Sequence, residues 1–131
     1  MKKLLLLLLL STSIHSETLT KTIDGDTFGS TYSVAGMKPL NVRVYGIDTP
    51  EKGWRAKCPA EKLLAKSATD YADKIIFKES NEVSFEPHGT DKYGRILVDI
   101  FVNGISYKDI MIEQGYAQEY KGHGPKPDWC K

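Results

Sequence analysis

Short β-rich runs separated by strong turn signals are the feature of this sequence that most restricts its fold. The runs LTKTI and TFGSTYSV flank Asp24-Gly25, and an Asp-Gly pair between two such runs is typical of a tight β-hairpin. After a further turn, the run Leu40–Ile47 predicts a third strand. Two later runs, Glu82–Glu86 and Arg95–Val102, predict a fourth and a fifth strand.

One long helix is predicted between the third and fourth strands. Pro59 suits its first turn, and small and apolar residues then recur at helical spacing. A polar loop around His88–Gly94 joins strands 4 and 5, and Ser106 is a candidate cap of a short helix that ends before Gly115. We therefore predict a mainly β chain with α: a five-stranded OB-fold barrel with a long helix between strands 3 and 4 and a short helix after strand 5. The helical spacing is that of Ala60, Leu64, Ala68, Tyr71, Ala72 and Ile75.

The N-terminus has the three parts of a secretory signal peptide. Two lysines precede seven leucines, and a small polar stretch follows. Cleavage after Ser16 or after Ser13 fits this pattern. A membrane anchor is the alternative, but a spanning helix needs about 20 apolar residues. We expect residues 1–16 to be a signal peptide and residues 17–131 to be one domain that is secreted or periplasmic, with no membrane association after cleavage.

The charge balance excludes one class of nucleic-acid-binding protein. The chain carries 18 lysines and arginines against 17 aspartates and glutamates. A protein that coats nucleic acid derives its affinity from many phosphate contacts and carries a large positive charge. If the partner of this chain is a polyanion, positive charge has to be concentrated at one site, with help from a metal ion.

Cys58 and Cys130 are the two cysteines of the chain. In an exported protein an even number of cysteines suggests a disulfide. The bond would tie the tail, residues 118–131, to the start of the long helix and contribute about 4 kcal/mol on the chain-entropy estimate. Two free thiols or half of a metal site are the alternatives, but no CxxC spacing supports zinc. We favour the disulfide.

The first of three polar clusters is DGDT, from Asp24 to Thr27. A hairpin turn alone accounts for the Asp-Gly pair, and one further aspartate is ordinary. Alternatively, Asp26 offers a hard oxygen ligand to Ca²⁺ or Mg²⁺. The acidic ladder of an EF-hand is absent. Taken alone, this cluster favours the turn.

Arg43 and the carboxylates of Asp48 and Glu51 form the second cluster, in the stretch RVYGIDTPE. Strand alternation points Arg43 away from its valine neighbours, and an arginine turned toward the interior needs an anionic partner. A structural ion pair at a strand end is one interpretation, and a site for a metal ion and a phosphate together is the other. Arg43 and Asp48 are five residues apart and fall on opposite faces of a regular strand. The second interpretation therefore requires a bulge or an early strand end at Gly46.

The third cluster is TDKYGR, residues 90–95. Charged, glycine-containing turns are common, so a solvated loop is one interpretation. The other gives Arg95 a guanidinium that clamps a phosphate through two parallel hydrogen bonds. Lys92 and Tyr93 would then be accessory contacts to phosphate or sugar.

The three motifs DGDT, R-x4-DTPE and TDKYGR occur in this order with a helix between the last two, and the chain resembles the staphylococcal-nuclease-like (thermonuclease) family in this pattern. The resemblance covers residues from about Thr18 to Ala117. It implies an OB-fold barrel with helices and a Ca²⁺-dependent phosphodiesterase that acts on DNA and RNA. It further implies cleavage of the 5′ P–O bond, which leaves 3′-phosphate ends, and a monomer.

The resemblance also implies how Ca²⁺ is bound. The positions that match the family's metal ligands are the side chains of Asp26 and Asp48 and the backbone carbonyl of Thr49. Asp24 matches an acid that lies close to these ligands. Glu51 matches the glutamate that is assigned as general base and orients or deprotonates a metal-bound water.

Substrate contacts are implied in the same way. Arg43 and Arg95 match the two arginines that hold the scissile phosphate and stabilise its charge in the transition state. Lys92 and Tyr93 match the family's nucleotide-contacting loop. The tail departs from the family pattern, because it has no tyrosine at the positions of the family's phosphate-contacting pair and ends in a short Gly/Pro segment. We expect Trp129, in that segment, to cover the core.

Three functions compete. The leading prediction is an exported, Ca²⁺-dependent nuclease for DNA and RNA. The alternatives are a non-catalytic nucleic-acid-binding OB-fold module and a structural calcium-binding domain. The presence of Arg43, Glu51 and Arg95 together favours the enzyme, because a structural calcium site does not need two arginines. Trp54, just after the DTPE motif, is expected either to stack on a base or to pack under a loop.

Overall fold

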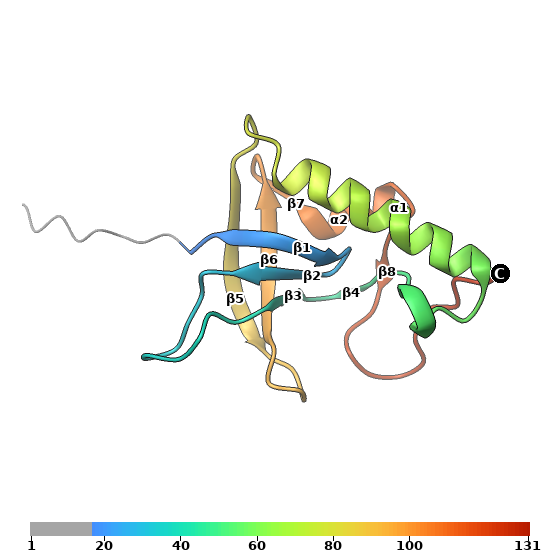
Figure 1. The fold of residues 1–131 in the computed structure, drawn as a ribbon, viewed down its shortest axis with the longest axis horizontal. Helices are drawn as coiled ribbons and strands as arrows, with labels where there is room; N and C mark the ends of the chain where they lie inside the picture. Colours follow the sequence, from blue (N-terminus) through green and yellow to red (C-terminus); the bar gives the residue numbers. More distant parts are fainter. Residues whose placement is uncertain (1–16) are drawn as a thin grey trace, which may run out of the picture.

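The computed structural model describes residues 17–131, so the expected signal peptide lies outside the described residues. Strands, one short 3-10 helix and two α-helices follow one another along the described chain (Figure 1). In order they are β1 (Leu19–Asp24), β2 (Thr27–Ser30), β3 (Val42–Val44), β4 (Ile47–Asp48), η1 (Gly53–Arg55), α1 (Pro59–Ile76), β5 (Val83–Thr90), β6 (Ile96–Val102), β7 (Ile105–Ser106), α2 (Tyr107–Glu113) and β8 (Gln118–Glu119).

Most strands belong to one mixed sheet. Its order is β1-β2-β3-β6-β5, with β7 paired to β6, while β4 and β8 form a separate two-stranded sheet. The β3–β6 pair is parallel and the other pairs are antiparallel. Figure 1 shows β5 and β6 running at a steep angle to β1 and β2, so the sheet is strongly curved. Within residues 17–131 no strand pairing joins β1 to β5, so the structure shows a mixed sheet with two helices and not the closed barrel that was predicted.

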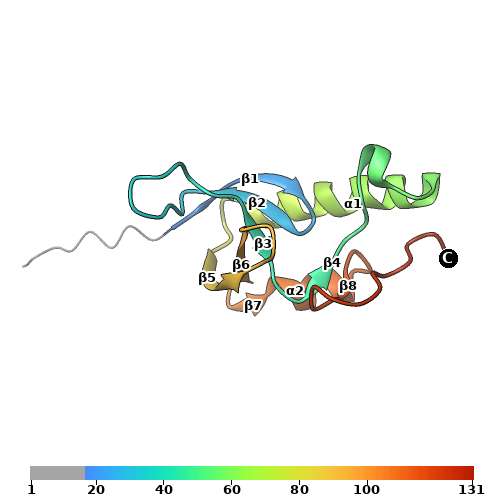
Figure 2. The same cartoon turned by 90° about the horizontal axis from the view of Figure 1, so that it is seen from below.

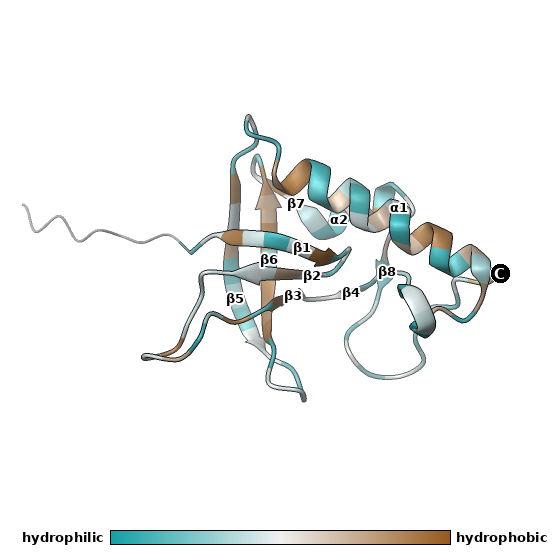
Figure 3. Cartoon of the chain, viewed as in Figure 1, coloured by the Kyte–Doolittle hydropathy of each residue, from teal (hydrophilic) through white to brown (hydrophobic). Residues whose placement is uncertain are grey.

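The hydrophobic core lies between the sheet and the two helices. Alternate residues of β6 are buried from Ile96 to Val102, and the apolar colouring of β6 is visible in Figure 3. On α1 the buried positions are mostly alanines, which let the helix approach the sheet closely. Tyr107 and Met111 of α2 are both fully buried, and the Tyr107 ring packs edge-on against Phe28. In β3 and β6 every second residue points into this core, so the residues between them point to the opposite face, which is available for a site.

The strand ends differ from the prediction in three places. The predicted strand Leu40–Ile47 is split into β3 and β4, because Gly46 adopts a φ of +87° that interrupts the ladder. The predicted loop around His88–Gly94 begins later, because β5 stays paired with β6 to Thr90 through an irregularity between Pro87 and Gly89. The second strand ends at Ser30, where its pairing with β1 also ends.

The start of α1 is fixed by its cap. Cys58 is the N-cap residue, its Sγ accepts a hydrogen bond from the Glu61 N–H, and Pro59 occupies the first turn as predicted. The buried side chain of Glu61 accepts hydrogen bonds from the backbone N–H groups of Glu51 (2.9 Å) and Lys57 (2.8 Å). One carboxylate therefore ties the segment after β4 to the helix.

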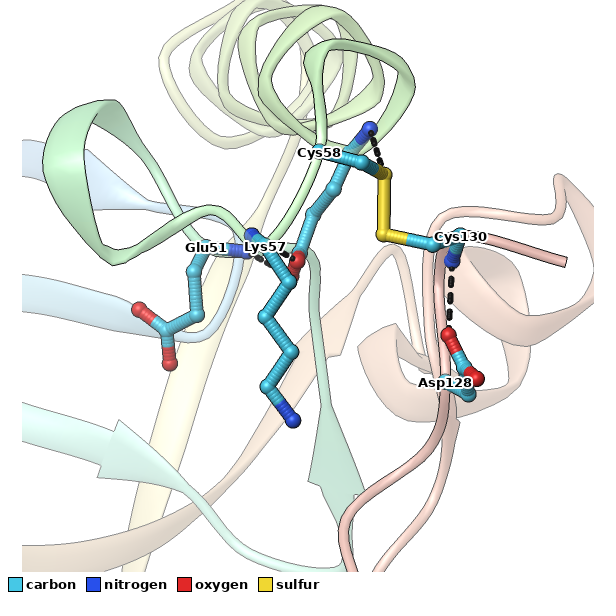
Figure 4. The surroundings of a disulfide bond; sticks show 6 residues. Glu51, Lys57, Cys58, Asp128 and Cys130 are labelled. Carbon is cyan, nitrogen blue, oxygen red and sulfur yellow. Dashed lines mark hydrogen bonds between the residues drawn. A yellow bond between two sulfur atoms is a disulfide. The ribbon is translucent and has the colours of Figure 1, made fainter.

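The C-terminal tail returns to the same region. β8 pairs with β4, and a disulfide joins Cys58 to Cys130 (Figure 4). Figure 1 and Figure 2 both show the C-terminus beside the first turns of α1. Within the described part of the chain, no helix has the length and apolar character needed to cross a membrane.

Candidate active site

Strand register brings Asp26 and Arg43 together. Thr27 of β2 pairs with Arg43 of β3, and the Val44 N–H donates to the Asp26 carbonyl at 2.8 Å. Asp26 therefore lies immediately before β2 and beside the arginine, with its Oδ2 3.3 Å from Arg43 Nη2. Val42 and Val44 are buried on the core side, as the alternation predicted, and Arg43 lies on the other face.

Asp48 joins this pair because the strand breaks at Gly46. The positive φ of Gly46 ends β3 and restarts the chain as β4, which turns Asp48 toward the side occupied by Arg43. Asp48 Oδ1 lies 3.7 Å from Arg43 Nη2, and the Asp48 side chain is only 3% exposed. The geometric condition set by the five-residue spacing is therefore met.

The DGDT turn packs directly onto the segment after β4. A Cβ on Gly25 would lie 3.1 Å from the Thr49 side chain, so any other residue would require Thr49 to shift by a few tenths of an ångström. Within the turn, the Asp26 N–H donates to Asp24 Oδ1 and the Thr27 hydroxyl donates to Asp26 Oδ1. Asp24, Asp26, Asp48 and Thr49 thus lie in one compact region, with Asp26, Asp48 and Thr49 buried.

The carboxyl groups in this region have shifted pKa values. Burial, together with the charge of Asp26, raises the pKa of Asp24 to about 8. Burial would also raise the pKa of Asp26, but hydrogen bonding from Asp24 and the charge of Arg43 outweigh it, so this pKa lies below its ordinary value. At Asp48, burial outweighs the hydrogen bond from Trp129 and raises the pKa. Burial therefore raises the pKa of Asp24 and Asp48, while Asp26 keeps a lowered pKa beside Arg43.

Arg95 reaches the same face through the parallel β3–β6 pair. Arg43 pairs with Leu97, and Arg95 lies two residues before Leu97, on the same side of the chain. Asp91 holds this arginine by accepting hydrogen bonds from its backbone N–H (2.9 Å) and its Nε (2.6 Å). Within residues 17–131, no hydrogen bond engages the two Nη groups of Arg95, and Arg95 lines a cleft.

The cleft has a volume of about 720 Å³ and brings most of the predicted residues together. Its walls include Asp24, Asp26, Arg43, Glu51, Lys92, Tyr93 and Arg95. Glu51 is 32% exposed, so water can reach its carboxylate. Tyr93 is 73% exposed, with Lys92 and Arg95 over its ring, and its backbone N–H donates to Asp91 Oδ1 at 2.9 Å.

The charge of the cleft answers the question raised by the near-neutral chain. Six lysine and arginine side chains line it, against four acidic ones. The cations are Arg43, Arg55, Lys92, Arg95, Lys121 and Lys126. Positive charge is therefore concentrated at one place, which suits a polyanionic ligand.

Two functional candidates in the tail were missed by sequence reasoning. Lys126 Nζ lies 3.5 Å from Glu51 Oε1 and 3.9 Å from Asp48 Oδ1. The Trp129 indole N–H donates to Asp48 Oδ2 at 3.2 Å, so Trp129 lies at the site and does not cover the core as expected. The proximity of Trp129 to Cys130 was the available signal, because a disulfide to Cys58 brings that part of the tail near the DTPE segment.

Two acids that support the site were also missed. Asp91 holds Arg95, and Glu61 holds the Glu51 backbone. Glu61 could have been recognised, because an acidic residue three positions after an N-cap typically bonds back to the chain before the helix. The Trp54 side chain is 89% exposed, which rules out packing under a loop.

The donor set fits a hard divalent cation. Asp26 and Asp48 both place an oxygen within 4 Å of Arg43 Nη2, so the two carboxylates converge on one region. Carboxylate and carbonyl oxygens are the ligands that Ca²⁺ prefers. Within the described residues, no group of three or more His, Cys, Asp or Glu side chains is arranged to hold a metal. A site here therefore has to be completed by a carbonyl, water or substrate.

The fold and the cleft define a class of protein: a small mixed-sheet domain in which buried carboxylates lie beside a cleft that two arginines line. Residues 41–128 match the family described as staphylococcal nuclease homologue, and the chain belongs to this family. The matched segment contains R-x4-DTPE, TDKYGR and most of the tail. The DGDT turn precedes it.

Individual relatives agree with this assignment. The chain is similar to the probable staphylococcal-like nuclease CAN4 of Oryza sativa subsp. japonica, with 27% identity over 94 residues, which is 72% of this chain and 17% of that protein. It is also similar to Endonuclease YncB of Bacillus subtilis, with 29% identity over 102 residues, 77% of this chain and 46% of that protein. The chain therefore spans less than half the length of these relatives.

Proposed function

We propose that this chain is an exported, Ca²⁺-dependent nuclease that hydrolyses phosphodiester bonds of DNA and RNA and leaves 3′-phosphate ends. The observation that carries the proposal is the convergence of Asp26 and Asp48 on Arg43. Asp26 and Arg43 also line a cleft together with Glu51 and Arg95. Family membership and the names of the relatives support the same activity.

Asp26, Asp48 and the Thr49 carbonyl would hold the calcium ion, with Asp24 bound to the Asp26 backbone beside them. When bound, the ion neutralises charge on the phosphate and promotes ionisation of water. The burial of Asp26 and Asp48 supports this role, because two buried carboxylates beside a single arginine are stabilised by a further positive charge.

The other residues supply positions and charge. Glu51, at the water-accessible wall of the cleft, takes the proton of the attacking water. Arg43 and Arg95 donate hydrogen bonds to the phosphate oxygens as their negative charge grows. Lys92 and Tyr93 contact the neighbouring nucleotide from the rim. The water oxygen bonds to phosphorus as the bond to the 5′ oxygen breaks, solvent protonates the leaving 5′ oxygen, and the phosphate stays on the 3′ side.

The proposal also includes export of the chain and its oligomeric state. Residues 1–16 direct export and are removed, and residues 17–131 act as one monomeric domain in the periplasm or outside the cell, without a membrane partner. The strand order β1-β2-β3-β6-β5 is the strand order of an OB-type fold. The alternative function is a non-catalytic nucleic-acid-binding module of this fold.

The test uses the purified mature protein with DNA and with RNA, in Ca²⁺ and in chelator. Glu51→Gln and Arg95→Ala should each lower the cleavage rate about 100-fold or more, because a general base and a charge-stabilising donor are removed. Glu113→Gln, an exposed residue on α2, is the matched control and should cleave at the wild-type rate.

Each outcome separates the alternatives. Binding of both polymers without cleavage by the wild type would establish the non-catalytic module. Equal rates in Ca²⁺ and chelator would overturn the calcium requirement alone. End-labelling of the products distinguishes 3′-phosphate from 5′-phosphate ends.

A further inference from the structure

The C-terminal strap, residues 120–130, forms part of the wall of the cleft. It starts where the Tyr120 N–H donates to the Gly46 carbonyl at 2.9 Å and ends at the disulfide to Cys58. After β8 the strap has no helix or strand, and most of its residues are exposed. Its position therefore depends on a few contacts, and several of them are to site residues.

One of these contacts fixes a carboxylate. The Trp129 indole N–H donates to Asp48 Oδ2 at 3.2 Å, whereas Asp48 Oδ1 lies on the side of Arg43 (3.7 Å) and Lys126 (3.9 Å). The two oxygens of Asp48 thus have different neighbours: one is held by the strap and the other faces the cations of the cleft. A carboxylate with one oxygen held in this way has less freedom to rotate, so its second oxygen keeps a fixed direction toward the cleft.

The covalent link is next to the contact. Cys130 follows Trp129 directly, and its partner Cys58 is the N-cap of α1 (Figure 4). The residues between Tyr120 and Trp129 have no strand pairing of their own, so without the disulfide the indole would depend on the Lys126 ion pairs to stay in place. Ion pairs of an exposed lysine contribute about 0–1 kcal/mol. The disulfide is the stronger restraint.

We propose that Trp129 is a positioning residue for Asp48, and that the Cys58–Cys130 disulfide holds Trp129 in place. This inference rests on the proposed function, in which Asp48 is a calcium ligand. Its consequence is that calcium affinity depends on the Trp129 indole N–H and on the oxidation state of Cys58 and Cys130. None of these three residues ligates the metal.

The first test compares Trp129→Phe with Trp54→Phe. Phenylalanine keeps an aromatic ring but removes the N–H donor. Trp54 is the matched control because it is 89% exposed, with the Arg55 guanidinium 5.3 Å from its ring centroid. Calcium binding is measured by titration calorimetry without nucleic acid, and folding by thermal unfolding in chelator. Trp129→Phe should weaken calcium binding about 10-fold or more, the usual effect of losing a partner of a metal ligand. Trp54→Phe should bind like the wild type.

The second test addresses the disulfide. Reduction of the wild type should weaken calcium binding to a similar extent, whereas reduction of Trp129→Phe should add little, because both changes remove the same restraint. In chelator, the Trp129 indole N–H resonance should shift in Asp48→Asn, which reports the hydrogen bond without any metal. A reduced wild type that binds calcium as tightly as the oxidised protein would overturn the role of the disulfide.

Failure of this inference can be told apart from failure of the proposed function. If Trp129→Phe binds calcium as tightly as the wild type and the wild type cleaves nucleic acid, only the positioning role is wrong. If the wild type binds calcium but does not cleave, the nuclease proposal is wrong while the positioning role is still measured. If the wild type binds no calcium, both the cofactor proposal and this inference are wrong.

Discussion

Arg43 is the residue at which the charges of the site meet. One of its Nη groups lies within 4 Å of both Asp26 and Asp48, and the other donates to the Val44 carbonyl at 3.2 Å. A planar guanidinium with several donors can serve two carboxylates and a carbonyl at once, which a lysine ammonium on a flexible stem cannot do with the same geometry. The ion-pair interpretation of this stretch and the site interpretation therefore describe the same contacts.

Asp91 is the residue that aims Arg95, and its removal should lower activity without unfolding the protein. Hydrogen bonds from Arg95 and Tyr93 outweigh partial burial and lower the pKa of Asp91, so the carboxylate stays charged at neutral pH. Asp91→Ala frees both the loop and the guanidinium, and a displacement of about 1 Å at such a group can cost about 100-fold in rate. We expect a 10- to 100-fold lower kcat in the nuclease assay.

The matched control for this prediction is Asp70→Ala. Asp70 also pairs with a basic residue four positions away, Lys66. Both side chains lie on the exposed face of α1, and both are more exposed than the Asp91 and Arg95 side chains. Such a pair contributes little, so this variant should cleave at the wild-type rate. Equal rates for Asp91→Ala and wild type would show that Arg95 finds its position without Asp91.

At the scale of elements, the break between β3 and β4 decides whether the site forms. Gly46 has a φ of +87°, and a Cβ there would lie 3.3 Å from Lys108 Nζ. Gly46→Ala should lower the free energy of unfolding by about 1–3 kcal/mol, because a non-glycine residue in the left-handed region is strained. Calcium affinity should fall as well, since the turn sets the direction of Asp48. Urea unfolding and calorimetry measure the two effects.

Gly89 provides the control for the Gly46 substitution. Gly89 lies in β5 with an ordinary φ, and a Cβ there meets no atom within 4 Å. Gly89→Ala should change the free energy of unfolding by less than about 0.5 kcal/mol, as for an exposed substitution without strain. If Gly46→Ala were equally harmless, the strand break would not depend on the glycine.

At the scale of the whole molecule, the disulfide joins residues that are 72 positions apart. On the chain-entropy estimate, closing a loop of this length stabilises the fold by about 4 kcal/mol. The double variant Cys58→Ser/Cys130→Ser should therefore have a free energy of unfolding lower by roughly this amount, measured by urea unfolding in chelator so that metal binding does not contribute. A loss of less than about 1 kcal/mol would mean that the tail is held mainly by other contacts.

The fold was predictable where a local sequence signal favours the same structure as the packing of the whole domain. The Cys-Pro start and the periodic alanines place α1 within about one residue of its observed limits, and alternation places β6. The strand ends were less predictable, since β2 ends and β5 continues according to pairing with neighbours that lie elsewhere in the sequence. A closed barrel was predicted from five short strands with a helix between the third and fourth, but the described residues show no β1–β5 pairing, because closure depends on the curvature of the whole sheet.

The sequence by itself determined which chemical groups are present and in which order: the DGDT turn, R-x4-DTPE, TDKYGR and two cysteines. It also determined that Gly46 can interrupt a strand, because that property belongs to the residue. Only the tertiary structure decided that Asp26 and Asp48 meet at Arg43, that Arg95 lines the same cleft as Arg43, and that Lys126 and Trp129 reach Asp48. The physical reason is that register, backbone twist and a disulfide act between residues far apart in the chain, and local patterns do not encode those distances.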